Sequence, residues 1–124
     1  MKMLCVGLVC ALVGCKRAET RVSLHVVNDG NQPLNRVNVL NERYRDKYSG
    51  EFSNIGIGSR SDYFGFLLGE AGDRISVEWS HSDGKSVLTN TFSVPELGNE
   101  SPKLPSLTLT FSDDAMAVSF EGRR

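Results

Sequence analysis

Apolar residues recur at every second position in short runs along most of this chain, and that spacing limits the folds open to it. Successive side chains of a strand point to opposite faces, so a period of two predicts strands with one buried face. Helical periodicity is nearly absent. The runs are separated by clusters of Gly, Pro, Asn, Asp and Ser, which are the residues that favour turns. The pattern therefore predicts an all-β chain of short strands.

Two hairpins are the clearest units of this pattern. In the first, an alternating run over residues 75–80 leads into a Gly-containing loop at 81–85, and the returning strand covers 87–94. In the second, alternating runs over 107–111 and 116–120 flank a short polar turn. Two alternating runs joined by such a loop are typical of antiparallel strand pairs.

Four further strands complete the pattern. They are expected at residues 22–26, 34–40, 52–57 and 63–68. Gly56, Gly58 and Gly65 in the last two indicate bulges or a close backbone approach. Stacking two sheets about 10 Å apart buries one face of every strand, so we expect an antiparallel β-sandwich of seven or eight short strands. The expected inward-facing residues are Val22, Leu24, Val26, Val37, Val39, Ile75, Val77, Trp79, Leu107, Leu109, Phe111, Met116, Val118 and Phe120.

Composition limits the chain to one domain and argues against nucleic acid as a partner and against disulfides or cysteine metal sites. The chain has 124 residues, of which 40% are apolar and 23% charged, and one domain typically takes about 100–150 residues. A net charge of -1 gives no general attraction to nucleic acid. Because Cys5, Cys10 and Cys15 all lie in the first fifteen residues, no disulfide framework or cysteine metal site is expected in the rest of the chain.

The first fifteen residues have the layout of an export signal. Lys2 supplies a positive charge, and residues 4–13 form a ten-residue apolar stretch. At about 1.5 Å per residue this stretch reaches only half of a hydrocarbon core of about 30 Å. It therefore fits the apolar region of a cleaved signal peptide rather than a membrane span.

The end of this stretch, Leu12-Val13-Gly14-Cys15, resembles the lipobox of bacterial lipoproteins. The resemblance implies cleavage between Gly14 and Cys15, a covalent diacylglycerol on the Cys15 thiol, and an acyl chain such as palmitate on its new amino group. Lys16 in place of Asp implies the periplasmic face of an outer membrane. An ordinary secretory signal that contains Cys is the alternative. The expected organisation is a lipoprotein signal peptide at 1–14, a lipidated tether at 15–20 and a β-sandwich domain at 21–124.

Residues 26–39, VVNDGNQPLNRVNV, resemble the first hairpin of carboxypeptidase-regulatory-like and transthyretin-like domains. In those domains a strand ends at a polar turn with Gly, and Pro-Leu followed by Val-x-Val begins the next strand. The resemblance implies a β-sandwich. It also implies a role in binding, adhesion or assembly, because domains of these families commonly have such roles.

No constellation for catalysis or metal binding is expected. His25, on the outward face of the first strand, and His81, in a hairpin loop, are too far apart in the sequence to predict a shared metal site. Ser82 and Lys85 have Ser-x-x-Lys spacing, but the Asp-Gly between them fits a turn rather than the helix that this chemistry needs. We therefore expect no enzyme activity, no metal and no cofactor. A hydrolase using Asp113, His81 or Ser82 is the weakest alternative.

Residues 41–52 depart from plain strand patterning. Asn41 can cap a short helix or turn, and three aromatic residues then recur at a spacing of four with basic residues between them. Because aromatic and Arg side chains are enriched in interface hot spots, this segment is the candidate contact surface. The alternative is a loop whose aromatics cover the end of the sandwich while its charges face solvent. The candidate contact residues are Tyr44, Arg45, Tyr48 and Phe52.

These features together predict a lipid-anchored protein of the bacterial envelope, most consistent with a non-enzymatic binding module. Its expected partners are the membrane, through the anchor, and an envelope protein, through the sandwich, with no nucleic acid. The alternative is a structural component of an envelope or secretion assembly, because transthyretin-like lipoproteins of type VI secretion systems resemble this layout.

Overall fold

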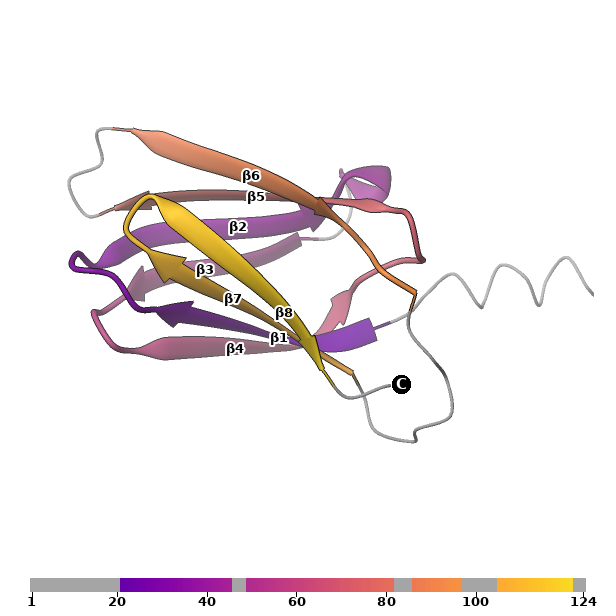
Figure 1. The fold of residues 1–124 in the computed structure, drawn as a ribbon, viewed down its shortest axis with the longest axis horizontal. Coiled ribbons are helices and arrows are strands. Elements are labelled where there is room, and N and C mark those ends of the chain that lie inside the picture. The colour runs from indigo at the N-terminus through magenta and orange to yellow at the C-terminus, as the bar shows by residue number, and fades with distance from the viewer. Residues whose placement is uncertain (1–20, 46–48, 82–85, 97–104, 122–124) are drawn as a thin grey trace, which may run out of the picture.

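The computed structural model describes residues 21–45, 49–81, 86–96 and 105–121, which form eight strands and one short 3-10 helix, η1 (Glu42–Tyr44) (Figure 1). The strands are β1 Arg21–Asn28, β2 Leu34–Asn41, β3 Ser49–Ile55, β4 Arg60–Leu67, β5 Arg74–His81, β6 Val87–Ser93, β7 Ser106–Ser112 and β8 Ala115–Glu121. The all-β prediction is confirmed. Within these ranges no helix has the length and apolar character needed to cross a bilayer. The predictions for Gly14, Cys15, Tyr48, Ser82 and Lys85 lie outside the described residues.

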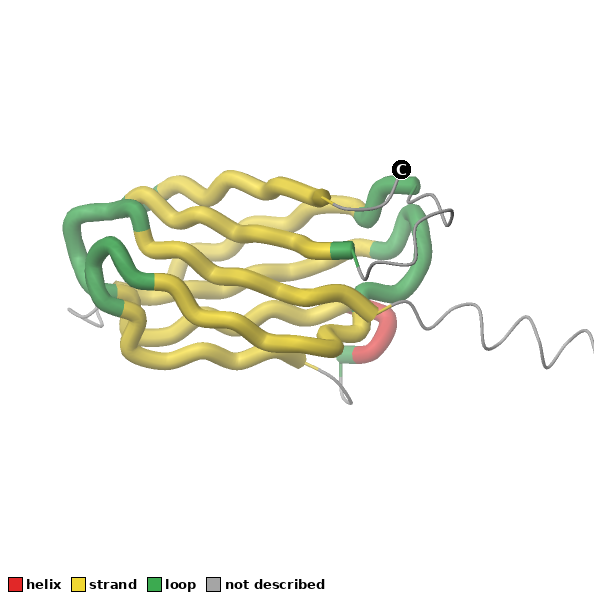
Figure 2. The backbone as a smooth tube through the Cα atoms, turned by 90° about the horizontal axis from the view of Figure 1, so that it is seen from below, coloured by secondary structure: helices red, strands yellow, loops and turns green. Residues whose placement is uncertain are grey.

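The strands form two four-stranded sheets, in the orders β4-β1-β7-β8 and β3-β2-β5-β6. The sheets stack face to face as a sandwich, which Figures 1 and 2 show from two directions. The two predicted hairpins are present as the antiparallel pairs β5–β6 and β7–β8. Both are local pairings across a short connection, so the alternating pattern on each side of a turn was sufficient to predict them.

The predicted first hairpin is wrong. β1 and β2 lie in different sheets, so the chain between them crosses from one layer to the other. Asn28, which is 1% exposed, holds this crossing: its Nδ2 donates to the carbonyls of Gln32 (2.9 Å) and Ile55 (3.0 Å), and its Oδ1 accepts from the Gly30 amide (3.0 Å). The same polar turn residues serve a hairpin or a crossing, so the turn sequence alone does not distinguish the two.

One strand pairing also differs from the antiparallel expectation. β1 and β7 run parallel, from Ser23 opposite Ser106 to Asn28 opposite Phe111. Parallel neighbours require a long connection between them, and here most of the chain lies between the two strands. The pairing therefore depends on contacts between residues far apart in the sequence.

The core lies between the sheets and matches the predicted faces on four strands. All predicted inward residues of β1, β2, β5 and β7 are buried. On β8, Met116 and Phe120 are only partly buried and Val118 is 36% exposed, because β8 is the last of the described strands in its sheet. The two sheets meet where Trp79 packs edge-on against Phe111, with ring centroids 5.0 Å apart. Further core residues that sequence reasoning did not include are Leu34, Phe52, Ile55, Phe66, Leu68 and Val94.

The glycine prediction is confirmed at Gly65. The β1–β4 register shifts between Val22 and Ser23, and Gly65, with φ of 85°, is the extra residue on β4. This is a β-bulge, and a positive φ favours glycine there. Gly58, with φ of 76°, lies in the turn between β3 and β4 rather than in a strand.

Candidate functional site

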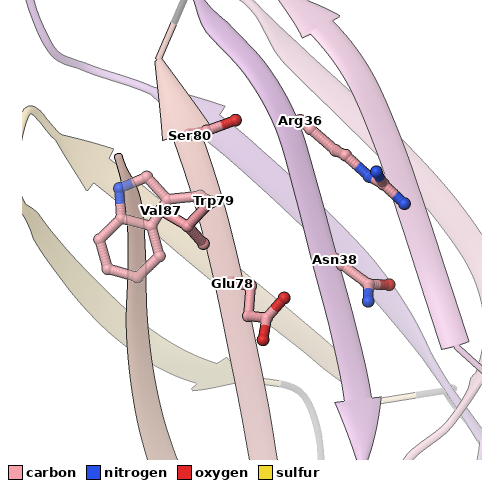
Figure 3. A pocket seen from close by; sticks show the side chains of 6 residues that line it. All are labelled: Arg36, Asn38, Glu78, Trp79, Ser80 and Val87. Atoms are coloured by element: carbon pink, nitrogen blue, oxygen red, sulfur yellow. The ribbon is translucent and has the colours of Figure 1, made fainter. Parts of the chain in front are cut away.

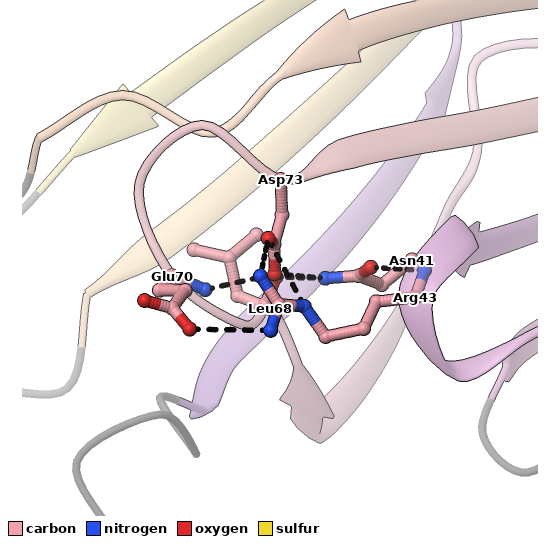
Figure 4. A network of polar contacts seen from close by, with 5 residues as sticks. All are labelled: Asn41, Arg43, Leu68, Glu70 and Asp73. Carbon is pink, nitrogen blue, oxygen red and sulfur yellow. Dashed lines mark hydrogen bonds and ion pairs between the residues drawn. The ribbon is translucent and has the colours of Figure 1, made fainter. Parts of the chain in front are cut away.

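The predicted cap at the start of the contact segment is present. Asn41 precedes η1 with an extended backbone, and its Oδ1 accepts a hydrogen bond from the Arg43 amide at 2.8 Å. Asn41 is itself buried, and its Nδ2 donates to the Leu68 carbonyl (2.8 Å) and to Asp73 Oδ2 (3.0 Å). The cap therefore also joins the end of β2 to the loop between β4 and β5, as Figure 4 shows.

The Asp73 carboxylate is the centre of this network. Its side chain is 5% exposed, and it accepts hydrogen bonds from Asn41, from the Glu70 amide (3.1 Å) and from Arg43, whose Nε lies 3.2 Å away. The Arg43 Nη1 also lies 3.4 Å from Glu70 Oε2. Charge-assisted bonds of this kind are stronger than neutral ones. Arg43, one of the basic residues within the predicted contact segment, is therefore used to fix η1 to the body of the sandwich.

The network shifts the pKa values of Asp73 and Arg43. Burial alone raises the pKa of Asp73, but hydrogen bonds from Asn41 and Arg43, and then from the Glu70 amide, outweigh it, so the pKa lies below its ordinary value. The hydrogen bond to Asp73 and its negative charge raise the pKa of Arg43. The ionised carboxylate is the form that the folded state favours.

Acid is therefore expected to destabilise the fold through Asp73. A carboxyl whose pKa is depressed on folding contributes stability that is fully present above its ordinary value of 3.8 and is lost as the pH falls through the lower, folded-state pKa. Urea unfolding at a series of pH values between 7 and about 2 should show this loss. The Asp73→Asn protein, which cannot titrate here, should lose less stability across that interval than the parent protein. An equal loss in the two proteins would contradict the role of Asp73.

The structure places the described candidate contact residues in different surroundings. Tyr44 is half-buried and Arg45 is exposed at the end of η1, where they lie side by side in the sequence. The prediction for Phe52 is wrong, because this side chain is 5% exposed in the core. Phe52 lies opposite the buried Val37 in the β2–β3 pair, and its ring packs edge-on against Tyr63. The four-residue spacing had extended a helical pattern into a strand, whose period is two.

The described start of the contact segment, η1 with Arg45, lies at the end of the sandwich where β1 begins. Arg21, the first residue of β1, is opposite Leu67 on β4, and the next carbonyl, that of Leu68, accepts the hydrogen bond from Asn41. Figure 1 shows η1 and the start of β1 at the same end of the molecule. Sequence reasoning did not place the segment there, because the contact joins residues 27 positions apart.

His25 lies on the outer face of its sheet, as predicted, but it is not isolated. Its Nδ1 donates to Asp62 Oδ1 at 2.6 Å, and Arg60 donates to the same oxygen from Nε at 3.2 Å. The hydrogen bond from His25 is the main cause that lowers the pKa of Asp62. The ring of Phe64 packs edge-on against the His25 ring. The three polar side chains thus form a surface cluster across β1 and β4.

His81 is the last residue of β5 rather than a loop residue, which corrects the prediction. Its Nε2 lies 3.0 Å from the Asp113 carbonyl, which the Trp79 Nε1 approaches at 3.4 Å. The Asp113 carboxylate instead accepts a hydrogen bond from the Asn31 amide at 2.8 Å. These contacts join the two sheets. Across the described ranges, no group of three or more His, Cys, Asp or Glu side chains is placed to hold a metal ion.

A depression of about 150 Å³ on β2, β5 and β6 is lined by Arg36, Asn38, Glu78, Trp79, Ser80 and Val87. In Figure 3 the side chains of Arg36, Asn38, Glu78 and Ser80 extend to one side, and the Trp79 indole extends away from them. Among the described residues none donates a hydrogen bond to the buried Oδ1 of Asn38. Sequence reasoning missed this site, because its residues become neighbours only through the β2–β5 register, which places Asn38 opposite Glu78.

The fold and these sites define an all-β sandwich of two four-stranded sheets. No protein-family model matches the sequence, and no curated protein matches it. A solved structure described as the NMR structure of the protein from Eubacterium rectale is similar over 80% of this chain and 86% of that chain, with a TM-score of 0.48 and 11% sequence identity. This similarity adds nothing about function.

Proposed function

We propose that this protein is a lipid-anchored, non-enzymatic binding module of the bacterial envelope, held at the periplasmic face of the outer membrane. The observation that carries the proposal is the run Leu12-Val13-Gly14-Cys15, directly after a short apolar stretch that follows Lys2. The sandwich begins at Arg21, close behind the proposed lipidated Cys15. Two or more acyl chains, each contributing about 0.8 kcal/mol per buried methylene, give stable anchoring.

The position of η1 supports a partner at the membrane surface. An extended chain spans at most about 3.6 Å per residue, so Arg21 lies within about 20 Å of an anchored Cys15. Tyr44 and Arg45 lie at the same end of the sandwich as Arg21. An envelope protein in or on the same membrane is therefore within their reach, and Arg43 and Asp73 hold the backbone of η1 in place for such a contact.

Substitution of Cys15 tests the proposal. The Cys15→Ser protein is expected to move from the membrane fraction to the soluble fraction, because it has no thiol to carry the diacylglycerol. The Cys10→Ser protein is the matched control: it changes a cysteine of the same apolar stretch and should stay in the membrane. Fractionation followed by immunoblotting checks both. Membrane retention of Cys15→Ser equal to that of the parent protein would overturn the lipoprotein proposal.

The same membranes test the binding module. Crosslinking and capture of the parent protein should recover a stoichiometric envelope partner, and the Tyr44→Ala, Arg45→Ala double variant should recover less of it. Arg36→Ala, an exposed arginine on a sheet face, is the matched control. Capture of one partner in equal amount by all three proteins would remove Tyr44 and Arg45 from the contact surface.

A structural component of an envelope or secretion assembly is the second candidate. The observation that favours it is the edge strand β6, which carries no charged residue. Uncharged edge strands are templates for pairing with another chain. This candidate requires co-fractionation with a large complex, whereas a binding module requires a small complex with one partner.

A further inference from the structure

Three of the four edge strands carry features that hinder pairing with another strand. β4 has the bulge at Gly65 and the charged pair Arg60 and Asp62. β3 contains Glu51 and, at Asn54, a positive φ of 55°. β8 ends in an acidic residue and follows an acidic turn. Charges, bulges and distorted backbone are the devices by which sheet edges avoid association.

β6 carries none of these features. Its sequence, VLTNTFS, contains no charged residue, glycine or proline. Every non-glycine residue with a positive φ among the described residues lies elsewhere. One side of β6 pairs with β5, and the strand is the last of its sheet. Among the residues that the structure describes, no strand pairs with its other side, which presents backbone groups along a regular, uncharged strand.

The side chains of β6 are also incompletely covered. Leu88 and Phe92 face the core but are only partly buried, and Phe92 packs against Phe120 of the opposite sheet with ring centroids 6.1 Å apart. Val87, at the start of the strand, is 65% exposed. A further strand beside β6 would remove more of this apolar surface from water, which is favourable.

We propose that β6 pairs in antiparallel orientation with β6 of a second copy of this chain, so that the sheets β3-β2-β5-β6 of two copies join into one continuous sheet. The two-fold axis passes beside Asn90, the central residue of the strand. This pairing does not depend on the lipid anchor. It adds a self-association surface to a molecule whose proposed partner contact lies on η1.

The sequence of β6 is suited to this symmetry. About a two-fold axis at Asn90, Leu88 lies opposite Phe92 of the partner subunit, and Thr89 lies opposite the partner's Thr91. Apolar side chains thus meet on the core face and threonines meet on the outer face, which are favourable cross-strand pairs. A closed two-fold dimer uses the same patch on both subunits, so that patch must be complementary to itself.

The same symmetry disfavours β8. A two-fold axis at its centre, Val118, would place Glu121 opposite Ala115 of the partner subunit and close to the partner's Asp114. Like charges on neighbouring strands are destabilising. A second copy meets no charge at β6, whereas a strongly charged foreign strand would find no opposite charge on it. The chemistry of the edge therefore favours the chain's own uncharged strand.

Introducing charges at the two-fold axis tests the proposal. Two copies of the full chain with different tags are co-expressed, one tag is captured from the solubilised cell fraction that holds the protein, and the second tag is quantified. Parent copies should be recovered together. With Asn90→Lys in both copies recovery should fall roughly tenfold or more, because two lysines then lie directly opposite each other. Asn90→Asp in both copies should have the same effect, and one copy of each should restore recovery.

Val118→Lys in both copies is the matched control, since it places the same charge at the centre of β8. Recovery should then be retained, and circular dichroism checks that each variant is folded. Parent copies that do not co-purify, or Asn90→Lys copies that still do, would overturn the proposal. A different protein that is captured by the parent and lost with Asn90→Lys, while the two tags stay apart, would assign the edge to a foreign strand and also overturn it. Each of these results is independent of the Cys15 experiment.

Discussion

Replacement of Phe111 by alanine is expected to lower the free energy of unfolding by about 3–5 kcal/mol. Phe111 is fully buried between the two sheets, and its ring packs against Trp79 of the opposite sheet. The truncation removes apolar contact and leaves a cavity that neighbouring side chains on two sheets fill only in part. For a domain of this size the melting temperature should fall by on the order of 15 °C or more.

The matched control is Phe64→Ala, the same truncation at a position that is 72% exposed on β4. This variant should lose less than about 1 kcal/mol, because little of the Phe64 side chain is withdrawn from water in the folded state. Thermal and urea unfolding of both variants beside the parent protein check the difference. Equal losses in the two variants would contradict the burial of Phe111 between the sheets.

The second large effect is expected from Gly69→Ala, which acts on the Asp73 network. Gly69 has φ of 90°, and a Cβ added there would overlap Asn41 Nδ2 and Asp73 Oδ2. Both side chains are held in short, buried hydrogen bonds, so they cannot move aside without breaking them. We expect a loss of about 3–5 kcal/mol, of which about 1–2 comes from the left-handed backbone and the rest from the broken hydrogen bonds.

Gly72→Ala separates these two contributions. Gly72 lies in the same loop with nearly the same φ, 91°, but no atom lies within 4 Å of its added Cβ. This variant should therefore show the backbone cost alone. The difference between the two variants, measured by urea unfolding, reports the contribution of the network. If Gly72→Ala is as destabilising as Gly69→Ala, the network makes no contribution beyond backbone strain.

Two buried asparagines in the described part of the chain serve the same purpose at opposite ends of β2. Asn28 holds the chain crossing before β2, and Asn41 joins the end of β2 to the loop that contains Asp73. Buried polar groups cost free energy unless they are hydrogen-bonded, and both amides are bonded on both their oxygen and nitrogen atoms. They therefore direct the backbone where it leaves the regular sheets.

Part of the candidate site could be predicted from the sequence. Asn41 was recognised as a cap because an Asn before a non-strand segment satisfies free amides locally, and the Arg43 amide is two residues away. The partners of Arg43 could not be predicted from the sequence, since Asp73 lies 30 positions further along the chain. Likewise the four-residue aromatic spacing predicted that both Tyr44 and Phe52 contact a partner, although β3 places Phe52 in the core.

The sequence by itself determined where the eight strands lie, with β3 and β4 each beginning three residues earlier than predicted, and which face of β1, β2, β5 and β7 is buried. Both properties follow from the alternation of neighbouring residues, which the backbone converts directly into opposite faces. Only the tertiary structure decided that β1 and β2 belong to different sheets, that β1 runs parallel to β7, and that β6 lies at the edge of its sheet. These outcomes depend on the free energy of packing two whole sheets together, to which residues distant in the sequence contribute jointly, so no local pattern contains them.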